Sequence, residues 1–62
     1  MNENQEKFID AVSYNEPNEP IGFVEKDGNI YIEYGGGDEF EFTLAEFEQI
    51  KLELPDVEFV RE

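Results

Sequence analysis

The stretch IGFVEKDGNIYIEY (residues 21–34) decides the fold of this chain. At its centre, Asp27-Gly28 is a two-residue turn of the kind that joins antiparallel strands into a β-hairpin. With that turn, Lys26 lies across from Asn29 and the side chains alternate between two faces. One face is apolar except for Glu25 and carries Ile21, Phe23, Ile30, Ile32 and Tyr34. The other face carries Val24, Lys26, Tyr31 and Glu33. One buried and one wet face is typical of an antiparallel sheet.

The residues after the hairpin predict a third strand. DEFEF (38–42) alternates strictly, so Phe40 and Phe42 are expected to face the core while the intervening glutamates face water. Three consecutive glycines (35–37) precede it. Glycine loops that cradle phosphates lead from a strand into a helix N-terminus, whereas this run leads into another strand. We therefore expect a turn between strands.

TLAEFEQIKLEL (43–54) changes period and predicts a helix. Thr43 and Glu46 have the spacing of a capping box, and Glu48 and Lys51 can pair across one helical turn. Pro55 ends the helix. Its apolar stripe consists of Leu44, Phe47, Ile50 and Leu54.

The two ends of the chain carry weaker signals. Residues 1–7 are polar, and we expect them to be frayed. FIDAVSY (8–14) fits one face of a helix and also one side of a strand; its Val, Ile, Phe and Tyr favour the strand. NEPNEP (15–20) is a turn or extended connector, because each proline lacks an amide donor. DVEFVRE (56–62) is typical of a last strand.

These elements predict a small α+β fold, with a single domain spanning residues 8–62. An antiparallel sheet of about three to five strands, centred on the hairpin 21–34, packs against one α-helix at about 44–54. The predicted core consists of Ile21, Phe23, Ile30, Ile32, Phe40, Phe42, Leu44, Phe47, Ile50, Leu54 and Phe59.

Composition argues against enzymatic chemistry. The chain has no cysteine and no histidine, which removes thiolate nucleophiles, imidazole bases and the usual zinc or haem ligands. Glu39 and Glu41 have a spacing that glycosidases use, but an open sheet in a chain of 62 residues offers little depth for a substrate pocket. Asp27 is followed directly by glycine, so the calcium-loop pattern is absent. We expect no enzyme activity, no cofactor and no specific metal site.

Charge is the strongest functional signal. Seventeen Asp and Glu against four Lys and Arg give a net charge of −13. Direct binding to nucleic acid or to an anionic membrane is disfavoured, since such binding depends on Lys and Arg. A partner should present a basic protein surface, such as that of a nucleic-acid-binding protein. No stretch has the apolar run of a signal peptide or a membrane span, so we expect a cytoplasmic protein of a bacterium or a phage-infected cell.

The carboxylates on the expected wet face can imitate a phosphate track. Alternate residues of a strand lie about 6.6–6.8 Å apart, a separation similar to that of neighbouring backbone phosphates. In size, acidity and lack of cysteine, the chain is similar to phage-encoded DNA mimics that inhibit host nucleases; the similarity is one of composition, and no motif carries it. The candidate partner-binding residues are Glu25, Glu33, Asp38, Glu39, Glu41, Glu46, Glu48 and Glu53.

Two other interpretations stay open. The acidic residues can form a solvated face that serves solubility alone. Alternatively, the chain is a small homo-oligomeric structural or accessory protein without mimicry. Such a homodimer would use apolar residues outside the predicted core, namely Val24, Tyr31, Leu52 and Val60, or an edge strand.

Overall fold

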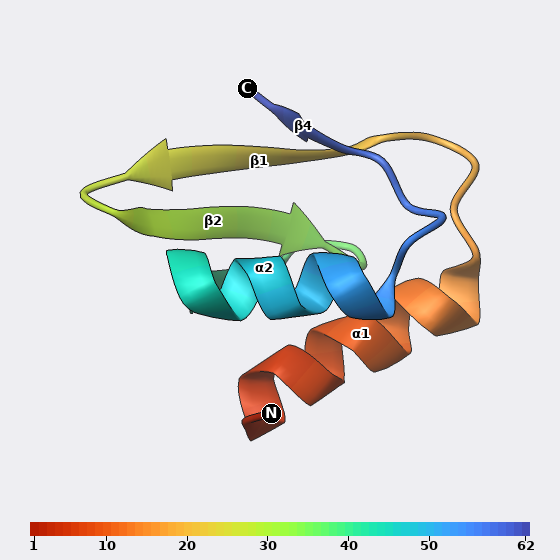
Figure 1. The fold of residues 1–62 in the computed structure, drawn as a ribbon. Coiled ribbons are helices and arrows are strands. Elements are labelled where there is room, and N and C mark those ends of the chain that lie inside the picture. The colour runs from red at the N-terminus through yellow and green to blue at the C-terminus, as the bar shows by residue number, and fades with distance from the viewer.

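Two helices pack against one face of a four-stranded sheet (Figure 1). The computed structural model of the protein describes all residues 1–62. The expected α+β class is confirmed, and the sheet order is β3-β2-β1-β4. The elements in chain order are α1 (Glu3–Asn15), β1 (Ile21–Lys26), β2 (Asn29–Tyr34), β3 (Asp38–Thr43), α2 (Leu44–Glu53) and β4 (Phe59–Arg61).

The central hairpin has the predicted register. Val24 pairs with Tyr31 and Lys26 with Asn29, so the turn contains two residues. Asp27 and its following glycine have φ angles of 54° and 81°, as a type I′ turn requires. The turn chemistry in the sequence therefore sets the alternation of faces in β1 and β2.

β3 extends the hairpin as an antiparallel edge strand. Ile30 pairs with Phe42 and Ile32 with Phe40, which places all four side chains on the helix-facing side. The glycine run 35–37 forms the connection to β2, with φ angles of 74°, 84° and 109° that residues with a Cβ rarely adopt. The prediction of a turn at this position is confirmed.

The preference for a strand at residues 8–14 is wrong, because these residues belong to α1. The helix begins with a capping box in which Asn2 and Gln5 bond each other's backbone amides. Phe8 and Val12, four residues apart, are fully buried. Residues 3–7 likewise form the first turns of this helix rather than a frayed N-terminus. The fold has two helices where the sequence predicts one.

The sheet is mixed rather than purely antiparallel. β4 lies beside β1 in parallel, with Ile21 paired to Phe59 and Gly22 to Val60. The reason is the connection: α2 carries the chain back along the helical layer, so β4 runs in the same direction as β3 and therefore as β1.

The core lies between the sheet and the helices. Leu44 is predicted to lie in it, but this first residue of α2 precedes the buried part of the helix, which begins at Phe47, and stays 46% exposed. Phe23 and Phe59 are half-buried at its margin. The buried apolar residues are Phe8, Val12, Ile21, Ile30, Ile32, Phe40, Phe42, Phe47, Ile50 and Leu54.

Candidate binding face

The sheet face that points away from the helices, called the outer face below, carries a mixed set of side chains. Four carboxylates lie on it and one ammonium, that of Lys26. Between them, Val24 and Tyr31 are 44% and 37% exposed. The face consists of Gly22, Val24, Lys26, Asn29, Tyr31, Glu33, Glu39, Glu41, Thr43, Val60 and Glu62.

Glu33 and Glu39 lie directly opposite each other on β2 and β3. The backbone amide of Thr43 donates to the side chain of Glu46, and the backbone carbonyl of Glu41 accepts from the side chain of Asn4. Neither backbone group therefore bonds to β2. Hydrogen-bonded and non-hydrogen-bonded residue pairs alternate along an antiparallel ladder, so Glu33 and Glu39 form a non-hydrogen-bonded pair. In pairs of this type the two side chains lie closest to each other. Like charges in this position destabilise a sheet.

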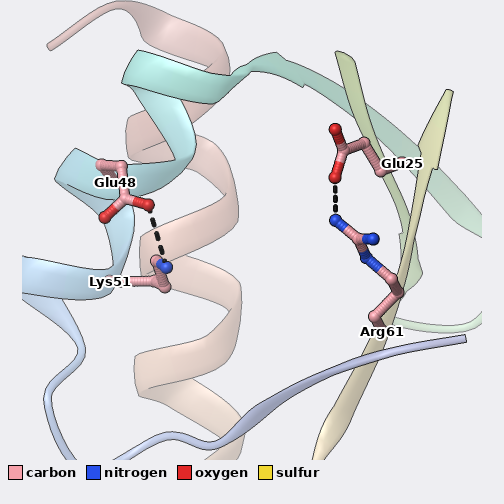
Figure 2. A network of polar contacts seen from close by, with 4 residues as sticks. All are labelled: Glu25, Glu48, Lys51 and Arg61. Carbon is pink, nitrogen blue, oxygen red and sulfur yellow. Dashed lines mark hydrogen bonds and ion pairs between the residues drawn. The ribbon is translucent and has the colours of Figure 1, made fainter. Parts of the chain in front are cut away.

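No basic side chain compensates this pair. The protein has two ion pairs, Arg61 with Glu25 and Lys51 with Glu48 (Figure 2). Neither includes a carboxylate of the outer face. The negative charge of Glu33 and Glu39 is therefore left to solvent or to a partner.

Glu41 is held in place by its neighbours on the same face. Its Oε2 accepts a hydrogen bond of 2.9 Å from the Asn29 amide and one of 3.3 Å from the Tyr31 hydroxyl. These bonds orient the carboxylate and leave its charge uncompensated.

The other predicted partner-binding residues lie elsewhere. Glu25 belongs to the helix-facing side of β1 and pairs with Arg61. Asp38 lies at the start of β3, across from Tyr34 in the register of β2 and β3. Three carboxylates belong to the helical layer, on the opposite side of the sheet from the outer face: Glu46, Glu48 and Glu53. The eight residues thus do not form one continuous track.

Glu46 has a structural role. One carboxylate oxygen accepts the Thr43 amide at 2.8 Å and so caps α2. The other accepts the side-chain amide of Asn2 at 2.7 Å, which joins the first turns of the two helices. Glu46 is thus committed to holding the helices together.

An open groove of about 340 Å³ lies on the outer face. Val24 and Tyr31 line it together with three carboxylates, those of Glu33, Glu39 and Glu62. No group of three or more acidic residues in the protein is arranged to hold a metal ion. The arrangement suits contact with a larger cationic or polar group, since the carboxylates surround an apolar floor.

Sequence reasoning missed two residues of this groove, Gly22 and Glu62. A Cβ on Gly22 would clash with a carboxylate oxygen of Glu62, so the side chain of Glu62 lies directly over the glycine. Their proximity follows from the parallel pairing of β4 with β1. No local pattern in the sequence carries that information.

In comparisons with known proteins, no family model, no curated protein and no solved structure matches this chain. Neither helix has the length and apolar content needed to cross a membrane.

Proposed function

We propose that this protein is a non-enzymatic binding protein whose outer face engages a basic surface of another protein. In the specific form of the proposal, that surface is a groove that takes nucleic acid, and the carboxylates occupy the positions of phosphates. The setting would be the cytoplasm of a bacterium or a phage-infected cell. The observation that supports the proposal is the uncompensated set Glu33, Glu39 and Glu41 on adjacent strands.

The spacing of these carboxylates suits a phosphate track. Glu39 and Glu41 are alternate residues of one strand, hence about 6.6–6.8 Å apart along it. Glu33 lies on the neighbouring strand β2, opposite Glu39, so the carboxylates form two rows. A partner groove that neutralises a row of phosphates with Lys and Arg would meet the same sign of charge at a similar interval.

The stability cost of the arrangement also supports a binding role. A carboxylate pair placed face to face on a small domain lowers its stability, and many neutral residues would fit an exposed strand position. Residues that lower the stability of a fold and make no compensating contact within it are expected on a surface that binds a partner. Solubility alone needs negative charge, but it does not need two opposed glutamates.

The homo-oligomer is the second candidate and has less support. Strand pairing through β3 would need its free edge, where Asn4 covers the carbonyl of Glu41 and Glu46 covers the amide of Thr43. Pairing of two outer faces would oppose carboxylates with their own copies.

The test is a pull-down from bacterial lysate with the tagged protein, washed at low and then high salt. We expect a nucleic-acid-binding protein to be retained at low salt, to be released by salt, and to be displaced by duplex DNA. The Glu39→Lys/Glu41→Lys variant should lose it.

The matched control is Glu48→Lys/Glu53→Lys, which changes the net charge equally but on the helical layer. If both double variants lose the partner alike, total charge rather than the outer face drives binding. If DNA does not compete, the mimicry proposal fails.

A further inference from the structure

We propose that the groove on the outer face receives an arginine side chain of the partner. The inference rests on the proposed function for the existence of a basic partner, and it names the group that the face recognises. Its basis is the combination of an apolar floor, a rim of unpaired carboxylates and the close approach of Glu62 to Gly22.

The groove has two chemically different parts. Its floor includes Val24 and the ring of Tyr31, both accessible from outside. Its rim carries the carboxylates of Glu33, Glu39 and Glu62, none of which takes part in an ion pair of this chain. An aliphatic stem with a cationic head matches both parts.

The absence of a side chain at Gly22 brings the third carboxylate into place. A Cβ at this position would clash with the Glu62 carboxylate oxygen, so any larger residue would move Glu62. The Glu62 side chain contributes to the groove on the β1 and β4 side, while Glu33 and Glu39 contribute from β2 and β3. The rim is thus assembled from both halves of the sheet.

Arginine fits this site better than other cations. Its planar guanidinium has five donors and can bridge two carboxylates, and it stacks on aromatic rings. Lysine presents a point charge that holds its water more tightly. The acidic groups form no arrangement for a metal ion, and a second copy would bring the same negative rim.

The experiment is an NMR titration of the 15N-labelled full chain with the blocked peptide Gly-Gly-Arg-Gly-Gly. Matched peptides carry lysine or neutral citrulline in place of the arginine. We expect amide shifts confined to the groove, at Gly22, Val24, Tyr31, Glu33 and Glu39. The lysine peptide should bind more weakly, and the citrulline peptide should give no shifts.

Variants locate the contact. Gly22→Ala displaces only the end of a flexible side chain, so the fold is kept while the rim loses Glu62. Gly22→Ala and Glu39→Gln should each weaken arginine binding by about two- to fivefold. Glu48→Gln, on the helical layer, should leave binding unchanged, and the spectrum of each variant checks that it is folded.

Absent shifts, shifts spread over all acidic surfaces, or equal binding of the lysine peptide would overturn the inference. So would unchanged binding in folded Gly22→Ala and Glu39→Gln. These results are independent of the pull-down. Groove-specific arginine binding without a DNA-displaced partner would contradict only the proposed function, and a DNA-displaced partner without groove binding would contradict only this inference.

Discussion

At the scale of single residues, Gln5 is the polar group on which the helical layer depends. The residue is only 2% exposed. The amide nitrogen donates to the carbonyl of Glu46 at 3.1 Å and to the side chain of Gln49 at 2.9 Å, while the amide oxygen caps the backbone of Asn2. One buried amide thus satisfies groups on both helices.

Replacing Gln5 by Glu keeps the shape of the side chain but removes the donor. The Gln5→Glu variant would point carboxylate oxygens at two oxygen acceptors, and we expect it to lose about 1–3 kcal/mol of stability. Urea unfolding measures the change, with Glu6→Gln on the exposed side of α1 as the control. An unchanged midpoint for Gln5→Glu would mean that the two helices do not depend on this amide.

Glu39 is a residue whose removal should stabilise the fold. Glu39→Gln removes the like charge opposite Glu33, and we expect a gain of about 0.2–1 kcal/mol at low salt. The gain should shrink in high salt, because the charges are exposed. Glu48→Gln, which breaks the ion pair with Lys51, should give no gain; equal gains in both variants would point to net charge instead of the opposed pair.

At the scale of elements, α1 is a full part of the core. Phe8 makes ring contacts with Tyr34, Phe40, Phe42 and Phe59, at centroid distances of 5.8, 5.1, 5.5 and 6.3 Å. These partners come from β2, β3 and β4. The helix therefore holds the sheet together from one side, although its sequence is mostly polar.

Truncation of Phe8 tests this role. Phe8→Ala should cost about 3–5 kcal/mol, a large share of the roughly 3–9 kcal/mol expected for a domain of 62 residues. We expect most of the variant to be unfolded or close to unfolding at 25 °C, as seen by circular dichroism and amide dispersion. Tyr14→Ala, at a position 89% exposed on the same helix, should behave like the parent protein. A stable Phe8→Ala variant would show that the sheet and α2 fold without α1.

At the scale of the whole molecule, excess negative charge opposes folding. With a net charge of −13 and only two ion pairs, repulsion in the compact state exceeds that in the expanded chain. Added NaCl should therefore raise the urea midpoint steadily from low salt to about 0.5 M, because the screening length falls from about 30 Å at 0.01 M to about 10 Å at 0.1 M and shortens further above that. A midpoint that falls as NaCl is added would mean that the two ion pairs outweigh the repulsion.

The sequence by itself determined the features that depend on neighbouring residues. The Asp27-Gly28 turn, the alternation of β3 and the Thr43–Glu46 capping box each involve groups a few residues apart, so local pattern was enough to predict the hairpin, β3 and α2. The same alternation predicted that Glu33, Glu39 and Glu41 face outward. Local chemistry thus determines which side of an element meets water.

Tertiary structure decided what depends on distant segments. Residues 8–14 had no decisive period, and burial against three strands selects the helix. The direction of β4 depends on how α2 crosses the sheet, and this direction brings Glu62 over Gly22. The same layering separates the carboxylates of α2 from those of the outer face. Such placements follow from burial and chain connectivity summed over the whole fold, which no short stretch encodes.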